Sequence, residues 1–324
     1  MAQDEGRLLQ NKAECPADGA ATPDPWHDML DRHGAEHGFH LRLGDRHGVL
    51  YTADARTLIV SFENAEVLRG TPTGLPLGLS VSGREGWSSL AVYSQGETWF
   101  RDPAVYSLFD TLIDECFFQD FDRVLFCGAG AGGYAAAAFS VAAPGADLLL
   151  IRPQATLDPA RTEWDRRYPQ MRRADWTGRY GYAPALAEAA QAITIVYDPF
   201  SPEDAMHAAL FPHDHALRLR TPRLGDRIER DLAAMDLLMP MIRLAGKGHL
   251  SAQRFGKLYR RRRTHLPYLR RVLTALERSD RPCLAGIWAR AALRGQSAPR
   301  LKKGLQSAEA TLQAKGRSLP PARG

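Results

Sequence analysis

Short apolar runs bounded by turn-forming residues recur through the middle of the chain. Runs of this length and composition are typical of buried strands. The predicted strands are residues 57–62 (TLIVSF), 88–93 (SSLAVY), 123–127 (RVLFC), 147–151 (DLLLI), 192–197 (AITIVY) and 216–220 (ALRLR).

Helical patterns alternate with these strands. They are predicted at 103–118, where Pro103 suits a first helical turn, at 134–141, at 184–191 and at 228–244, with a break at Pro240. Strands that are apolar along their whole length and alternate with helices predict an α/β fold. We expect a mostly parallel sheet with helices on both faces, spanning residues 26–245.

The two ends of the chain have a different pattern. Residues 1–25 are rich in Ala, Asp, Pro and Gly with little apolar periodicity, so we expect a flexible N-terminus. Residues 246–298 predict a basic helical segment. Residues 299–324 lose the helical periodicity, and we expect a disordered tail there.

Charge separates the same regions. The whole chain has a net charge of +5, but residues 246–324 contain 19 basic and 3 acidic residues, a net charge of +16. The remainder has 23 basic and 34 acidic residues, a net charge of −11. An acidic partner therefore suits the basic segment: RNA, DNA, an anionic membrane surface or the acidic body itself. No nucleic-acid module signature is present, so nucleic acid is the less favoured partner.

Several classes of protein are disfavoured. No run of 18 apolar residues occurs, and the N-terminus lacks the basic start and apolar run of a signal peptide, so we expect a cytoplasmic protein without a membrane span. Cys15, Cys116, Cys127 and Cys283 are too far apart for a zinc-type pair. We expect reduced thiols, no metal and no cofactor.

A glycine-rich turn, FCGAGAGGYAAAA at 126–138, lies between a predicted strand and a predicted helix. It fits the nucleophile elbow G-x-S-x-G, in which Gly130 occupies the serine position between Gly128 and Gly132. It also fits the dinucleotide fingerprint through Gly128, Gly130 and Gly133. The fingerprint belongs at the first strand of its unit, whereas strands precede this turn. At the end of the next strand, where an acidic ribose partner belongs, stands Arg152, which would suit a 2′-phosphate instead. The elbow is the favoured interpretation.

The chain also resembles a group of bacterial α/β-hydrolase-like proteins of poorly defined function. The resemblance spans about 39–284 and rests on SFEN (61–64), GWSSLAVY (86–93), TWFRDPAV (98–105), the stretch 116–146 around the glycine turn, PQATLDP (153–159), VYDPFSPEDAMHAALF (196–211) and RRRTHLPYLR (261–270). Some similar proteins carry the label phosphoadenosine phosphosulfate reductase. Such a reductase needs an SGGxDS-type phosphate loop and a reactive C-terminal cysteine motif, and this sequence has neither.

The resemblance implies a degenerate catalytic triad. Relatives tend to have serine at the elbow and histidine after the last strand; here the serine position is Gly130, and the histidine position aligns best with Arg227. Asp198 is similar in position to the triad acid, with Asp204 as second choice. A glycine removes the nucleophile, and an arginine stays protonated and cannot act as the base. We therefore expect that serine hydrolase activity is lost.

A binding role is the favoured hypothesis. Helix N-termini attract anions, and Arg227 would add a cation, so one hypothesis is an anion pocket formed by Gly130, Ala131, Gly132 and Arg227. For Arg227 itself the favoured interpretation is the simpler one, an ion pair with Asp198 or Asp226.

Two enzymatic alternatives stay open. One is an esterase or acyl hydrolase that works through other residues, for instance in polysaccharide metabolism. His207, His213 and His215 are candidates to replace the missing base. The other is a nucleotide-dependent enzyme, using a dinucleotide or phosphoadenosine phosphosulfate, that binds through the Gly128–Gly133 loop.

Overall fold

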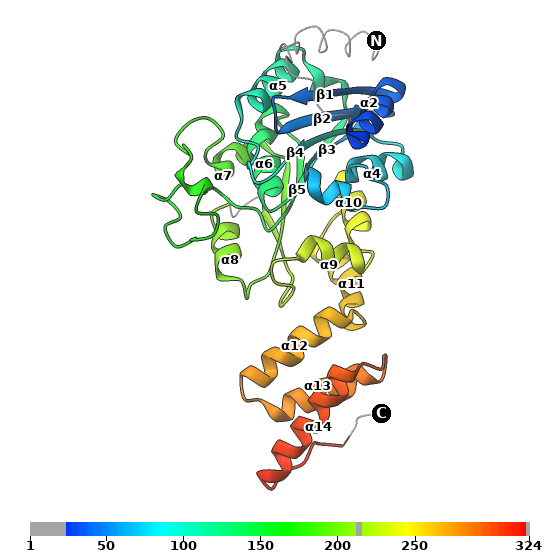
Figure 1. Ribbon diagram of the computed structural model, residues 1–324, viewed down its shortest axis with the longest axis vertical. Coiled ribbons are helices and arrows are strands. Elements are labelled where there is room, and N and C mark those ends of the chain that lie inside the picture. The colour runs from blue at the N-terminus through cyan, green and yellow to red at the C-terminus, as the bar shows by residue number, and fades with distance from the viewer. Residues whose placement is uncertain (1–23, 212–215, 322–324) are drawn as a thin grey trace.

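A computed structural model describes residues 24–211 and 216–321 of the chain. Eight strands form one sheet in the order β1-β2-β4-β3-β5-β6-β7-β8 (Figure 1). The strands are β1 (Gly38–Leu43), β2 (His47–Thr52), β3 (Thr57–Asn64), β4 (Ser88–Ser94), β5 (Arg123–Ala129), β6 (Asp147–Ile151), β7 (Ala192–Tyr197) and β8 (Ala216–Arg220). β2 runs antiparallel to both of its neighbours, β1 and β4. The remaining strands, β4, β3, β5, β6, β7 and β8 in sheet order, all run parallel to one another.

This topology confirms the predicted α/β class and the mostly parallel sheet. The strand order, with an antiparallel second strand and a sharp turn from β5 into a helix, is that of the α/β-hydrolase fold. The six predicted strands are all present. β1 and β2 were not predicted. β1 lies at the sheet edge with four of its six positions exposed or partly exposed, and its sequence GFHLRL lacks a continuous apolar run.

The described chain forms helices that cover both faces of the sheet and others that extend beyond it. They are α2 (Pro25–His37), α3 (Ala65–Arg69), α4 (Leu77–Glu85), α5 (Pro103–Asp114), α6 (Ala131–Phe139), α7 (Ala183–Leu186), α8 (Pro202–Ala209), α9 (Ile228–Ala234), α10 (Leu238–Gly246), α11 (Ala252–Leu258), α12 (Leu266–Arg278), α13 (Pro282–Leu293) and α14 (Pro299–Ala314). Residues of α5, α6, α7 and α8 share one buried cluster with one sheet face, and α4, α9, α10 and α11 share another with the opposite face. The predicted 228–244 helix breaks between Ala234 and Leu238, so Pro240 lies inside the first turn of α10 and not at the break.

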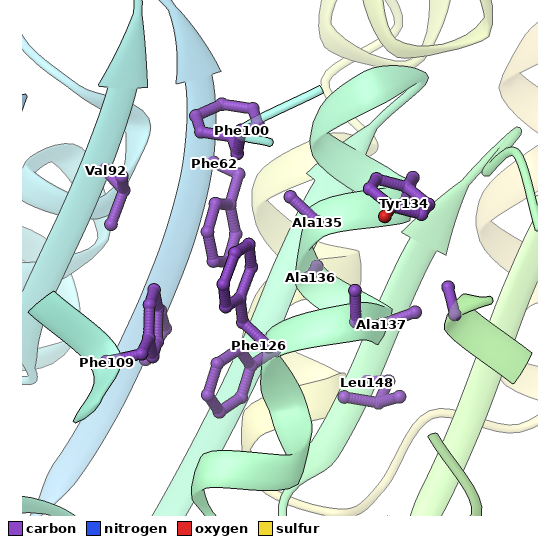
Figure 2. Close-up of a cluster of buried hydrophobic side chains, with 14 of the residues drawn as sticks. Phe62, Val92, Phe100, Phe109, Phe126, Tyr134, Ala135, Ala136, Ala137 and Leu148 are labelled. Carbon is purple, nitrogen blue, oxygen red and sulfur yellow. The ribbon is translucent and has the colours of Figure 1, made fainter. Parts of the chain in front are cut away.

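The larger of these clusters holds the central strands against α5 and α6. Figure 2 shows the rings of Phe62, Phe109 and Phe126 meeting beside the alanines of α6. The rings of Phe62 and Phe109 stack with centroids 5.9 Å apart, and both are almost completely buried. Small side chains at Ala135 and Ala136 let α6 lie close to the sheet, which fixes the direction in which its N-terminus points.

Beyond α10 the chain forms helices that project from the sheet domain (Figure 1). α12, α13 and α14 share their own buried cluster, which contains Leu269, Leu273 and Leu301. The prediction of a disordered tail from residue 299 was wrong for 299–314, which form α14. Its buried positions include Gly304 and Ala308, and such small residues give a weak apolar pattern. The flexible N-terminus predicted for 1–25 lies almost entirely outside the described residues.

Within the part of the chain that the structure describes, none of the helices is both long enough and apolar enough to cross a bilayer.

Candidate functional site at the β5–α6 elbow

The turn between β5 and α6 has the geometry of a nucleophile elbow. Gly130 has φ 56° and ψ −119°, and α6 begins at the next residue. A Cβ on Gly128 would lie 2.2 Å from the Gly132 carbonyl oxygen, and one on Gly132 would lie 2.3 Å from the Phe62 carbonyl oxygen. Side chains are therefore excluded at both positions, which explains the flanking glycines of the motif without a nucleotide ligand.

Arg152 covers the position that a nucleophile would occupy. A Cβ on Gly130 would lie 3.5 Å from Nη2 and 3.9 Å from Cζ of Arg152, at ordinary contact distance. Arg152 directly follows β6, and its backbone N–H donates to the Val196 carbonyl at 2.7 Å. The strand pairing of β6 with β5 and β7 thus places the guanidinium over the elbow.

The Arg152 guanidinium has one carboxylate partner. Its Nε and Nη2 lie 3.3 Å and 3.5 Å from the two carboxylate oxygens of Glu229 in α9, which are long distances for a bidentate pair. The Arg152 side chain is 15% exposed and that of Glu229 is 35% exposed. Burial lowers the pKa of Arg152, but Glu229, helped by Tyr168 and Asp204, outweighs burial and holds it above the ordinary value. The guanidinium stays charged beside the N-terminus of α6.

Arg227 does not lie at the elbow. Its side chain is 65% exposed, and its Nε lies 3.9 Å from the exposed carboxylate of Asp226. Apart from Gly130 and its two chain neighbours, only Arg152 among the described residues has atoms within 4 Å of a Cβ built on Gly130. The cation that the sequence hypothesis assigned to Arg227 is therefore supplied by Arg152, and Arg227 makes the pair with Asp226 that was its alternative.

Asp198 lies at the end of β7, where the triad acid was expected, but its carboxylate accepts hydrogen bonds from backbone N–H groups. Its carboxylate accepts from the backbone N–H groups of Phe200 (2.9 Å), Arg223 (2.9 Å) and Gly225 (2.7 Å). These bonds fold the loop after β8 onto the end of β7, and residues 221–227 of that loop contain no histidine. Because these hydrogen bonds hold the loop against Asp198, Arg227 lies on the outer surface of the protein.

His207 is buried and already engaged by polar partners. Its side chain is fully buried, its Nδ1 accepts from the Ala155 N–H at 3.2 Å, and its Nε2 lies 2.8 Å from Asp165. Burial lowers the pKa of His207. Asp204, the second choice for the acid, accepts from Arg167 at 2.7 Å. Both residues hold the segment after β6 through these contacts. His213 and His215 lie outside the described residues.

No protein-family model and no curated protein matches the sequence. Several solved structures are similar to this chain in fold. The capsule O-acetyltransferase of Neisseria meningitidis serogroup A is 11% identical, with a TM-score of 0.40 over 62% of this chain and 93% of that one. An esterase from Pyrobaculum calidifontis is 13% identical, with a TM-score of 0.42 over 75% and 99%. A dienelactone hydrolase from Anabaena variabilis is 14% identical, with a TM-score of 0.41 over 64% and 93%. Likeness at this level carries no information about activity, so we base the function on the residues of the site.

A second polar arrangement lies at the same edge of the sheet. His47, at the start of β2, has Nε2 2.8 Å from the Thr98 hydroxyl and Nδ1 3.6 Å from the Asp102 carboxylate. Burial lowers the pKa of His47 to about 4, so the ring is neutral near pH 7. Nδ1 is buried without a hydrogen-bond partner. The next two residues after Thr98, Trp99 and Phe100, both have positive φ, a strained backbone that is uncommon outside glycine.

Trp99 connects this arrangement to the elbow. Its indole N–H donates to the buried Gln154 side chain at 3.2 Å, and its ring meets that of Tyr168 edge to face. Gln154 and Tyr168 both belong to the long segment that follows β6. This segment, which begins at Arg152 beside the elbow, therefore packs against Trp99.

Sequence reasoning missed Glu229 and the role of Arg152. The signal for Arg152 was present, since it directly follows the strand after the glycine turn and that position faces the turn in a parallel sheet. Glu229 gave no signal, because its contact with Arg152 joins elements 77 residues apart. Among the described residues, no three His, Cys, Asp or Glu side chains converge as a metal site would require.

Proposed function

We propose that this chain is an α/β-hydrolase-fold protein that lacks serine hydrolase chemistry and binds a small anion at the β5–α6 elbow. The anion would be a carboxylate, sulfate or phosphate group. It would be held by the Arg152 guanidinium and by the backbone amides of Ala131 and Gly132, where the helix dipole of α6 adds a favourable field.

The observation that supports this proposal best is the position of Arg152 over Gly130. In a hydrolase the residue at this turn presents its side chain to the substrate and needs a neighbouring base. Here the side chain is absent, and a permanent cation stands 3.5 Å from where its Cβ would be. A cation beside a helix N-terminus favours a bound negative charge and leaves no group to accept a proton.

Glu229 acts in this proposal as an internal competitor. It already pairs with Arg152, at distances long enough for an incoming anion to replace it at modest cost. Removal of Glu229 should therefore strengthen anion binding, and removal of Arg152 should abolish it. Because either change breaks the same ion pair, the two variants control for each other.

A thermal-shift panel tests the proposal. Sulfate, phosphate and acetate should raise the Tm of the wild type and of Glu229→Gln, and should leave that of Arg152→Gln unchanged. Arg227→Gln should behave as the wild type. An equal anion shift in Arg152→Gln would refute the site. A shift confined to adenine nucleotides or NADPH would instead favour the nucleotide alternative at Gly128–Gly133.

The acyl hydrolase alternative has one supporting observation, the order Thr98–His47–Asp102. When the Thr98 hydroxyl donates to Nε2, the neutral ring carries its proton on Nδ1, toward Asp102, as a nucleophile relay requires. Thr98 and His47 are nevertheless only 2% and 3% exposed, which argues against access by substrate. Turnover of p-nitrophenyl acetate that disappears in both Thr98→Val and His47→Gln would favour this alternative.

A further inference from the structure

Some cations of the basic segment hold it to the sheet domain. Arg261 donates from Nη1 to the carbonyls of Met235 (3.2 Å) and Asp236 (2.9 Å), and Arg271 pairs with the buried Asp231. The Arg261 contacts fix the 3-10 helix Tyr259–Arg263 against the turn between α9 and α10, and the Arg271 pair fixes α12 against α9. The remaining basic side chains of α11 and the 3-10 helix therefore extend from backbone that is packed against the sheet domain.

Lys257, Arg260 and Arg263 are free of such contacts. All three are exposed, and none has an ion pair or a side-chain hydrogen bond within the described chain. They recur every third residue through the end of α11 and the 3-10 helix. Residues three apart share a face of an α-helix and eclipse in a 3-10 helix, with a rise of about 5–6 Å per step. The three side chains therefore form a line, the basic row.

Acidic residues are scarce in the segment that carries the basic row. Residues 246–324 contain only three acidic residues. Two of these are already paired, Glu277 with Arg300 and Asp280 with Lys315. Figure 1 places α11 at the junction between the sheet domain and the projecting helices, on an extended part of the molecule that a large partner can approach.

We propose that the basic row binds the phosphate backbone of a double-stranded nucleic acid without reading its sequence. A line of evenly spaced cations, two of them arginines, matches a line of evenly spaced phosphates and can make bidentate contacts with them. Sequence alone ranked nucleic acid low, because the run of basic residues looked like an ordinary solvated helix surface. The unpaired, aligned side chains change that ranking.

The same region disfavours other anionic surfaces. Its aromatic residues, Phe255 and Tyr259, are buried, so no ring is offered for stacking against the bases of a single strand. Within the described chain, α11 and the 3-10 helix expose no large apolar side chain that could insert into a bilayer.

The experiment is a salt titration of binding to a short mixed-sequence DNA duplex, followed by fluorescence anisotropy of the labelled DNA. The test variant is K257Q/R260Q/R263Q. The control variant is R46Q/R84Q/R173Q, which removes the same charge from three exposed arginines of the sheet domain. All replaced side chains are exposed, so both variants should fold, and circular dichroism checks this.

The wild type and the control should bind the duplex, and an unrelated duplex should compete equally well. The test variant should bind at least tenfold more weakly. The slope of log K against log salt should fall in magnitude by about 2–3, because each lost phosphate contact removes roughly 0.9. Three results would each overturn the proposal: no binding by the wild type at low salt, equal losses in both variants, or row-dependent binding to anionic phospholipid vesicles or single strands in preference to the duplex.

Discussion

At the scale of single residues, Gly130 decides which chemistry the elbow can perform. The turn keeps the backbone conformation that exposes a nucleophile in this fold, with φ 56°, but has no side chain there. Arg152 fills the adjacent space, and Asp198 is used by backbone amides. Under the proposed function we therefore expect that a single reversion does not rebuild a hydrolase.

We predict that Gly130→Ser gains no hydrolase activity. The new hydroxyl would face a protonated arginine and find no base, so p-nitrophenyl acetate turnover should equal that of Gly130→Ala. Both variants should lose about 1–3 kcal/mol of unfolding free energy, because a residue with a Cβ is strained at this φ. Urea denaturation measures the loss. Serine-specific turnover, or labelling by a fluorophosphonate, would contradict the assignment of a lost triad.

His47 should make the protein sensitive to acid. Its folded pKa of about 4 lies below the ordinary 6.5, so as the pH falls the unfolded chain takes up a proton before the folded chain does. The stability that the neutral ring contributes is present above pH 6.5 and is lost as the pH falls toward 4. Between pH 7 and 4.5 this loss amounts to about 2–3 kcal/mol.

Urea denaturation at these two pH values checks the prediction. His47→Gln should show a smaller decrease in unfolding free energy between pH 7 and 4.5 than the wild type, by about the stated amount. Equal decreases would mean that other groups account for the acid sensitivity.

At the scale of secondary-structure elements, the close approach of α6 to β3 positions the anion site. The Gly132 Cα lies against the Phe62 carbonyl, and this contact sets where the first amides of α6 point. The contact also explains why small residues dominate the helix.

Gly132→Ala should therefore destabilise the fold by about 2–3 kcal/mol, because a backbone carbonyl 2.3 Å away cannot move cheaply. Gly256→Ala is a matched control, since that glycine is also helical but has nothing within 4 Å of an added Cβ. It should stabilise the protein by about 1 kcal/mol through helix propensity. Thermal unfolding distinguishes the two, and a neutral Gly132→Ala would mean that α6 is not held as close as described.

At the scale of the whole molecule, the central sheet could be predicted from sequence and the site only in part. The central strands β3 to β7 gave apolar runs and were predicted, as was the edge strand β8. The largely exposed β1 and the buried β2 were not predicted. The predicted tail disorder overlooked α14, whose packing positions include Gly304 and Ala308.

The site partners were harder to predict than the elements. The glycine turn identified the elbow, because its spacing reports local backbone geometry. The arginine was assigned to position 227 because alignment places residues by order along the chain. In the fold, hydrogen bonds from Arg223 and Gly225 to Asp198 displace that loop, and β-sheet register brings Arg152 to the turn instead. Such long-range contacts leave no local sequence pattern.

The most direct test of the central claim is a calorimetric titration of sulfate into the wild type, Arg152→Gln and Glu229→Gln. We predict saturable one-site binding to the wild type, at least tenfold weaker binding to Arg152→Gln, and binding to Glu229→Gln that is as tight or tighter. The two variants break the same ion pair, so a general loss of structure would weaken binding in both. Equal affinities in all three proteins would contradict an anion site at the elbow.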